Sequence, residues 1–201
     1  MSVAKPEGRS LSKSISVGLL LGGMFLFTTL TFDGILLMAF VASAAGAGAW
    51  ELSTALRLKG WYVPRVPAVV GSVLIMPATY FYGQEIQWAF SIAIVAALIL
   101  WRTVHLLWER RVSPMQPLQK TLRDYAAAAF LVIYLPLTLS FAMMLLRRPE
   151  DGQMWVLTFV LVVSMIDTFG YLVGRKLGRH KMAPGVSPKK TLEGLAASVT
   201  A

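Results

Sequence analysis

The sequence predicts an all-α integral membrane protein: a polytopic helical bundle of about six transmembrane helices, with both termini in the cytoplasm. Composition is the first indication, because 56% of the 201 residues are hydrophobic, 14% are charged and the mean hydropathy is +0.64. Ordinary soluble domains do not reach these values. Long apolar runs, several of them near the roughly 20 residues that cross a bilayer, are the second. The third is that lysine and arginine gather in alternate connections.

The apolar runs define the expected elements in order. They cover residues 15–32, 35–50, 66–83, 86–108, 125–146 and 154–173. None shows the two-residue alternation of a membrane β-barrel. We therefore expect three parts: a cytoplasmic N-terminal segment at 1–14, a transmembrane bundle at 15–173, and a basic cytoplasmic loop with the start of a further helix at 174–201.

Orientation follows from the short connections. The segments at 1–14, 51–65, 109–124 and after Gly174 are basic, whereas the turns at 33–34 and 83–85 carry no positive charge. Positive connections stay on the cytoplasmic side, so the pattern predicts an N-in, C-in arrangement. Arg147 and Arg148 break the pattern, although Glu150 and Asp151 offset their charge.

Within the bundle, the pattern predicts packing rather than chemistry. Small residues from 42 to 49 are spaced for close helix contact. Pro77 and Pro136 are expected to kink their helices. Arg102 is interpreted as a side chain that snorkels to the headgroups, and Arg123 with Asp124 as an entry pair at the interface.

Several kinds of chemistry are excluded or disfavoured. The chain has no cysteine, so it holds no disulfide and no thiol nucleophile. Its two histidines, His105 and His180, are far apart in the sequence, which disfavours a zinc site. The net charge of +9 favours an anionic membrane surface or anionic substrates. No nucleic-acid partner is expected.

Asp167 is the notable acid, because it lies within an apolar run about 10 Å before Gly174 at the helical rise per residue. Intramembrane carboxylates are costly to desolvate and are functional hypotheses by default. It is a candidate ligand for a divalent cation in a cytoplasmic cavity. The alternative is a structural acid paired with a lysine or arginine.

The segment that follows leaves the apolar run through Gly174 and Gly178 and runs through clustered basic residues to Ser187-Pro188-Lys189-Lys190-Thr191 and Glu193-Gly194. Positive charge at this place is explained by topology and lipid attraction alone. Topology and lipid attraction do not explain the hydroxyls and glycines at particular positions, since both need charge alone. A phosphate site does, because phosphate oxygens favour positive charge and hydrogen-bond donors together. We interpret the segment as a polyanion-handling face at a membrane surface.

This pattern resembles the phosphatidate cytidylyltransferase (CDP-diacylglycerol synthase) family. The resemblance is specific over about residues 125–194, and its residues are Tyr134, Pro136-Leu137, Leu145-Leu146-Arg147, Asp167, Tyr171, Gly174-Arg175, Gly178, Pro184, Ser187-Pro188-Lys189-Lys190-Thr191 and Glu193-Gly194. It implies the reaction of CTP with phosphatidate to give CDP-diacylglycerol and pyrophosphate with Mg²⁺, in phospholipid biosynthesis.

The resemblance also implies roles for particular residues. Lys189 and Lys190 are the catalytic candidates that contact phosphate, and Asp167 is the metal candidate. The substrate-binding candidates are Ser187, Thr191, Arg175 and Glu193. The implied partners are CTP, phosphatidate and anionic membrane lipids, with a homodimer as a further expectation. The implied location is the bacterial inner membrane, with the site facing the cytoplasm.

One departure qualifies this assignment. Members of the family continue through further helices to a second signature rich in Lys, Asp, His and Gly, which supplies the main metal-binding carboxylates. This sequence ends at Ala201 on residues that resemble the start of another helix. We therefore expect an N-terminal fragment whose activity alone is in doubt. The alternative function is a non-catalytic membrane scaffold or small transporter that binds anionic lipid.

Overall fold

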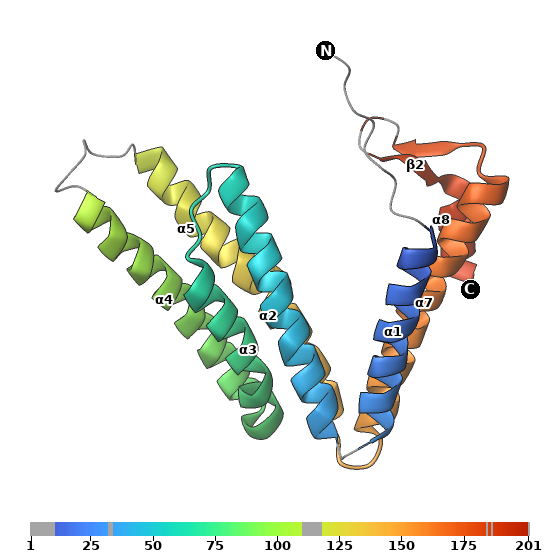
Figure 1. Ribbon diagram of the computed structural model, residues 1–201, viewed down its shortest axis with the longest axis horizontal. Coiled ribbons are helices and arrows are strands. Elements are labelled where there is room, and N and C mark those ends of the chain that lie inside the picture. The colour runs from blue at the N-terminus through green and yellow to red at the C-terminus, as the bar shows by residue number, and fades with distance from the viewer. Residues whose placement is uncertain (1–10, 32–33, 110–117, 184, 186, 201) are drawn as a thin grey trace. The chain divides into compact units, whose positions relative to one another are not determined.

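The structure is a computed structural model that describes residues 11–31, 34–109, 118–183, 185 and 187–200 (Figure 1). Its helices up to residue 146 are α1 (Leu11–Leu30), α2 (Ile35–Leu58), α3 (Arg65–Tyr82), α4 (Gln84–Glu109), α5 (Leu118–Val132), the π-helical turn η2 (Ile133–Leu137) and α6 (Thr138–Leu146). The remaining elements are α7 (Gly152–Leu177), β1 (Lys181–Ala183), β2 (Ser187–Thr191) and α8 (Leu192–Thr200).

The helical membrane class predicted from composition is confirmed. Within the described ranges, four helical stretches are long and apolar enough to cross a membrane: Ile35–Leu58, Gln84–Trp108, Leu118–Leu146 and Gly152–Leu177. Ser16–Leu30 is a shorter apolar helix, and α3 is not among the four. The chain is therefore an integral membrane protein by the length and composition of its helices, and the count of six spans stays a prediction.

The chain divides into two compact units, at Gln153 and Met154. In the first unit, α2 packs on α3, α3 on α4, and α4 on α5 (Figure 1). The largest side chains that are fully buried in it include Leu37, Ile75, Met76, Leu98, Leu131 and Met143. The second unit contains α7 from Met154 onward, the two strands and α8.

Small residues on α2 do bring helices together, as their spacing predicts. A methyl group added at Gly46 would lie 2.8 Å from Cγ2 of Val73 on α3. One added at Gly48 would lie 3.2 Å from Leu135 in η2. Hydrogen in place of a side chain therefore lets both neighbours approach the α2 backbone, as in other small-residue contacts between membrane helices.

The expected kink at Pro136 takes the form of the π-helical turn η2 inside one continuous helix from Leu118 to Leu146. Proline has no N–H, so the regular hydrogen-bond ladder is interrupted there. The Thr138 hydroxyl bonds to the carbonyl oxygens of Tyr134 at 2.6 Å and Leu135 at 2.9 Å. These bonds give carbonyl groups near the interruption a partner inside the helix.

Two connections are shorter than the sequence predicts. The second helix extends to Leu58 instead of ending near Trp50, which places Glu51 inside it and Arg57 in its last turn. The fifth helix begins at Leu118, seven residues before the predicted start at 125. Polar residues can extend a membrane helix past the apolar run that was used to locate it, so hydropathy alone underestimates its length.

The interpretation of Arg102 and Asp124 as interfacial residues is wrong. Their side chains form a buried ion pair, with Nη2 of Arg102 2.8 Å from Oδ2 of Asp124 and exposed fractions of 4% and 1% for the two residues. Asp124 Oδ1 also accepts the N–H of Tyr62 at 2.9 Å. The Arg102 guanidinium lies 4.3 Å from the centre of the Tyr62 ring. Together these contacts tie the α2–α3 connection to α4 and α5.

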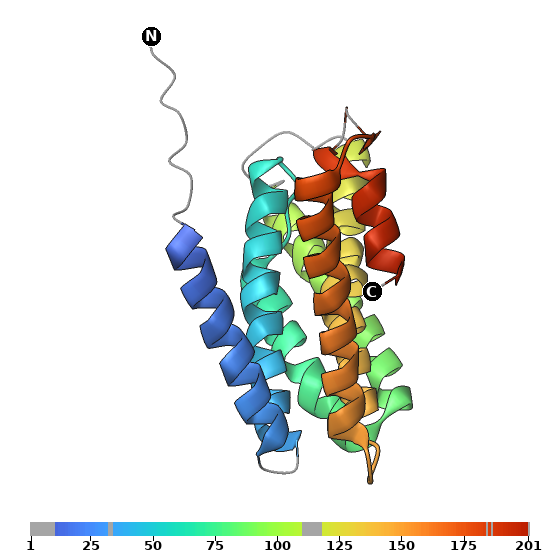
Figure 2. The same ribbon diagram turned by 90° about the vertical axis from the view of Figure 1, so that its right-hand side faces the viewer.

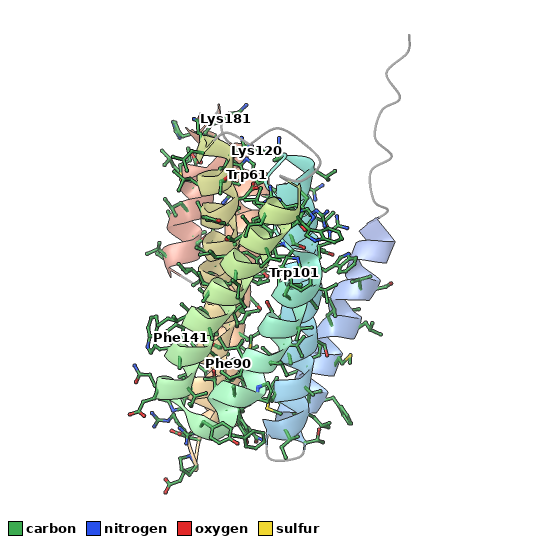
Figure 3. All side chains as sticks on the ribbon, turned by 90° about the vertical axis from the view of Figure 1, so that its left-hand side faces the viewer. Trp61, Phe90, Trp101, Lys120, Phe141 and Lys181 are labelled. Carbon is green, nitrogen blue, oxygen red and sulfur yellow. The ribbon has the colours of Figure 1, made fainter. Side chains whose placement is uncertain are left out.

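Among the described residues of the first unit, Arg57, Lys59 and Arg65 lie at the end where α2 meets α3. Trp61 and Lys120 mark this end in Figure 3, and Phe90 lies toward the opposite end. Arg123 donates a hydrogen bond to the Gly60 carbonyl oxygen at 3.3 Å. At the opposite end, Arg148 pairs with Asp151 at 2.7 Å.

Candidate functional site

Asp167 lies within α7, and its side chain is exposed in the second unit. Among the described residues, none forms a hydrogen bond or ion pair with its carboxylate, so the predicted pairing with a lysine or arginine has no described partner. Gly170 and Gly174 follow at spacings of 3 and 7 residues along the same helix, and Gly178 comes directly after its last residue, Leu177. These spacings put Asp167, Gly170 and Gly174 on one face of α7, because 3.6 residues complete a turn.

The three glycines form a seat for the segment that follows. A methyl group at Gly174 would lie 3.0 Å from Oγ1 of Thr191, and one at Gly178 would lie 2.6 Å from the same atom. At Gly170 it would meet the Ser198 hydroxyl of α8. Gly194 completes the seat, since a methyl group there would lie 2.7 Å from the Gly170 carbonyl oxygen.

This contact fixes the path of α8. Thr191 lies opposite Gly174 and Gly178, whereas Ser198 lies opposite Gly170. The helix therefore runs back along α7 in the antiparallel sense (Figure 2). Gly174 was predicted to begin a loop, and that interpretation is wrong: α7 continues to Leu177, and the glycine serves close packing.

Between α7 and α8 the chain forms a short antiparallel pair of strands, which the sequence did not predict. Lys181 pairs with Thr191 and Ala183 with Ser187, and the register shifts between the two pairs. We call residues 181–191 the basic hairpin. Strands of three and five residues with lysine and proline in them give almost no periodic signal, which explains why a loop was expected.

The turn from β2 into α8 uses its polar groups internally. Thr191 Oγ1 accepts the N–H of Gly194 at 3.2 Å, which is the contact of a helix N-cap. The Leu192 N–H donates to the carbonyl oxygen of His180 at 2.9 Å. Two of the first N–H groups of α8 are therefore bound within the second unit rather than directed at a ligand.

Glu193 is held by His180. The His180 N–H donates to Oε1 and Oε2 of Glu193 at 3.1 and 3.3 Å, and ring atom Nδ1 lies 2.7 Å from Oε1. Hydrogen bonds from its own backbone N–H and from the His180 side chain lower the pKa of Glu193 to about 2. The carboxylate is therefore ionised throughout the physiological range. Sequence reasoning missed His180, because no local pattern links it to a residue 13 positions away.

The remaining predicted residues lie around the hairpin. Ser187, Lys190 and Thr191 share β2, with Lys190 exposed and the other two partly buried. Arg175, near the end of α7, donates to the Tyr171 hydroxyl at 3.1 Å. The Lys189 side chain and Pro184 lie outside the described residues.

Asp167 is separate from this group along α7. It precedes Arg175 by eight residues, which is about 12 Å at the helical rise. The described parts of the chain contain no group of three or more His, Asp or Glu side chains placed to hold a metal ion. The second unit thus contains a cationic hairpin with hydroxyl groups, and one carboxylate, that of Asp167, within the preceding helix α7.

The sequence as a whole is similar to a known family. The sequence model of the cytidylyltransferase family matches residues 13–201. A phosphatidate cytidylyltransferase of Mycobacterium leprae (strain TN) is 33% identical over 199 residues, which cover 96% of this chain and 62% of the relative. One from Mycobacterium tuberculosis (strain ATCC 25618 / H37Rv) is also 33% identical, over 96% of this chain and 58% of the relative.

A more distant relative shows the same name. The phosphatidate cytidylyltransferase of Staphylococcus aureus (strain COL) is 31% identical over 163 residues, covering 80% of this chain and 57% of the relative. The chain therefore spans less than two thirds of the length of these curated relatives. No solved structure gives a significant match.

Proposed function

We propose that this chain, which belongs to the cytidylyltransferase family, contributes to a phosphatidate cytidylyltransferase that converts CTP and phosphatidate to CDP-diacylglycerol and pyrophosphate. The names of the relatives support this assignment. The observation that carries it is the basic hairpin at the end of an apolar helix: Thr191 is seated against Gly174 and Gly178, and Lys190 beside it on β2 is exposed. That arrangement suits a reaction between two phosphorylated substrates, one of them a lipid.

The chemistry requires anions to be brought together. A phosphate oxygen of phosphatidate attacks the α-phosphorus of CTP, the bond from that phosphorus to the bridging oxygen breaks, and pyrophosphate leaves. Cationic side chains offset the repulsion between the substrates and stabilise the charge on the transferring group. Much of the remaining rate enhancement in phosphoryl-type transfer comes from positioning.

We assign these tasks to residues of the hairpin and its surroundings. Lys190, exposed on β2, and Lys189 contact the phosphates. Ser187 and Thr191 donate hydroxyl hydrogens; the Thr191 oxygen accepts the Gly194 N–H, which leaves its O–H available as a donor. Arg175 supplies a further cation from α7, oriented by its contact with Tyr171.

We also propose that Mg²⁺ is bound jointly by the substrate phosphates and the protein. Mg²⁺ sites often use one or two carboxylates together with substrate phosphates. Asp167 fits the role of such a single ligand, because its carboxylate is exposed and without a described partner. When bound, the ion would neutralise phosphate charge.

We further propose six spans with both termini inside, a location in the bacterial inner membrane and a site that faces the cytoplasm. The clustering of lysine and arginine at one end of the first unit supports this orientation. Lipid substrate would then enter from the bilayer and CTP from the cytoplasm. Anionic lipids as further partners and a homodimer stay predictions.

The test is transfer of radiolabelled cytidylyl groups into lipid by the protein that carries this chain at its full natural length. Lys190→Ala is expected to lower kcat/KM by about 10- to 100-fold, as loss of a charge-assisted phosphate contact does. Lys190→Arg should retain part of the activity. Lys59→Ala is the matched control, since Lys59 is also an exposed lysine but lies at the end of α2.

The same assay separates the enzyme from the scaffold or transporter alternative. A scaffold that binds anionic lipid needs only charge, so shuffling the order of residues 187–191 with their charge kept would leave its lipid binding intact. An enzyme would lose transfer in that variant. Unchanged rates in Lys190→Ala and in the shuffled variant would refute the assignment of the hairpin as the site.

A further inference from the structure

We infer that His180 and Glu193 form a clamp that positions the basic hairpin, and that Glu193 acts on the reaction through this clamp rather than by binding substrate or metal. The inference rests on the proposed function for its kinetic consequences. It concerns His180, which the sequence did not single out, and it changes the role of Glu193 from the substrate-binding one predicted above.

The contacts close the hairpin at its base. His180 directly precedes β1, and Glu193 follows β2 by two residues. The His180 N–H and ring Nδ1 both bond to the Glu193 carboxylate, at 3.1 and 2.7 Å to Oε1. The backbone adds the bond from the Leu192 N–H to the His180 carbonyl oxygen at 2.9 Å. Side chain and main chain of His180 therefore both hold the start of α8.

The hairpin needs such a closure because it is short. An isolated two-stranded hairpin is at best marginally stable in water. Here β1 has three residues, and the register between the strands is irregular. The clamp lies next to the Lys181–Thr191 pair, so it holds the end of the hairpin that lies closest to the glycine seat.

The same contacts argue against a ligand role for Glu193. Oε1 lies within hydrogen-bonding distance of two His180 nitrogens, and Oε2 accepts the His180 N–H at 3.3 Å. A metal ion or a substrate donor would compete with these bonds for the carboxylate, and Oε1 already has two short contacts. Coordinating carboxylates are themselves oriented by hydrogen bonds, but they keep an oxygen directed at the ion.

A double-mutant cycle in the full-length protein distinguishes the two roles. His180→Leu removes the imidazole, Glu193→Gln weakens the acceptor, and the third variant combines them. If the two residues act only through each other, each single variant should lower kcat/KM by about 3- to 10-fold, the usual range for one lost hydrogen bond. The double variant should then lose no more activity than the worse of the two single variants. His180→Asn, whose amide can donate near the position of Nδ1, should recover most of the activity.

Magnesium dependence separates clamp from ligand. The clamp predicts that the Mg²⁺ concentration for half-maximal rate is the same in Glu193→Gln as in the unaltered protein. The inference would be overturned if that Mg²⁺ concentration shifted in Glu193→Gln but not in His180→Leu, and if the fold-losses of kcat/KM in the two single variants multiplied in the double variant. Asp151→Asn is the matched control, because it alters another exposed ion pair, that of Arg148, in a different part of the chain.

Hydrogen exchange provides a readout that does not depend on activity. Amides of residues 181–191 should exchange about 3- to 10-fold faster in His180→Leu and in Glu193→Gln, with α2 and α3 unchanged. Unchanged exchange in the hairpin of both variants would overturn the clamp even if activity fell. Absence of cytidylyl transfer by the unaltered protein would instead refute the proposed function alone, because exchange still decides whether the clamp orders the hairpin.

Discussion

Individual residues in this chain gain their roles from partners that are distant in sequence. Arg102 and Asp124 show this most clearly, since their charges are buried and are compensated by each other and by the Tyr62 N–H. Two buried charges are costly to desolvate, and the pair is stable only while its geometry is complete. Its effect is to fix the connection between α2 and α3.

Removing one member of this pair should be strongly destabilising. Asp124→Ala leaves the Arg102 guanidinium buried without its carboxylate, and we expect a loss of about 3–5 kcal/mol of unfolding free energy. Thermal or denaturant unfolding in detergent would measure it. The exposed neighbour provides the comparison: Arg123→Ala should cost about 0–1 kcal/mol, and an equal loss in both variants would contradict the special role of the buried pair.

The Glu193 carboxylate predicts how the hairpin responds to acid. Its pKa is lowered in the folded protein, from 4.5 to about 2, so the unfolded or opened state binds the proton more readily. The stabilising contribution is therefore complete above pH 4.5 and is lost as the pH falls toward 2. Hydrogen exchange of residues 181–191, corrected for the intrinsic rate, should rise as the pH falls from 4.5 toward 2. Glu193→Gln should remove this dependence.

At the level of elements, the helices were predictable and the site geometry was not. Long apolar runs identified the helices because burial in lipid is decided by composition over some 20 residues. The small-residue pattern from 42 to 49 also predicted close packing, and Gly46 against Val73 confirms it. The basic hairpin and its clamp depend on a few polar contacts across 13 residues, and such contacts leave no periodic trace.

Arg102 illustrates the same limit within a helix. Its position near the end of an apolar run is compatible with snorkelling or with a buried pair. Which of the two applies depends on Asp124, which lies 22 residues later in the sequence on another helix and accepts a hydrogen bond from Arg102. Hydropathy does not contain that information. The sequence pattern singled out the basic segment and Asp167, and the family resemblance gave the lysines and hydroxyls their predicted roles; neither could place these residues relative to one another.

The glycine seat gives a prediction for a whole element. Gly178→Leu would force a side chain into the space of Thr191, and we expect β2 and the start of α8 to separate from α7. Faster protease cleavage between residues 180 and 195 would report the separation. Gly22→Leu on α1 is the control, because a methyl group there meets nothing within 4 Å. Equal protease resistance of both variants would show that the seat is dispensable.

At the scale of the whole molecule, the asymmetry of charge predicts topology. Lysine and arginine are concentrated at one end of the first unit, with Trp61 and Lys120 marking that end in Figure 3. Such bias sets the orientation of membrane proteins during insertion. Arg147 and Arg148 lie in the connection before α7 that the N-in arrangement places outside, and the pairing of Arg148 with Asp151 reduces their effective charge.

Residues 1–201 contain no cysteine, so a thiol introduced among them can serve as the target of a membrane-impermeant maleimide, and the unaltered protein gives the background labelling. Lys59→Cys and Lys181→Cys should label only in inside-out vesicles. Glu85→Cys and Glu150→Cys, both exposed in the structure, should label only from the outer side of intact cells. Labelling of Glu150→Cys from the cytoplasmic side would mean that the helix from Leu118 to Leu146 does not cross the bilayer. Labelling of Lys181→Cys from outside would place the basic hairpin across the membrane from cytoplasmic CTP, and the proposed function would fail with it.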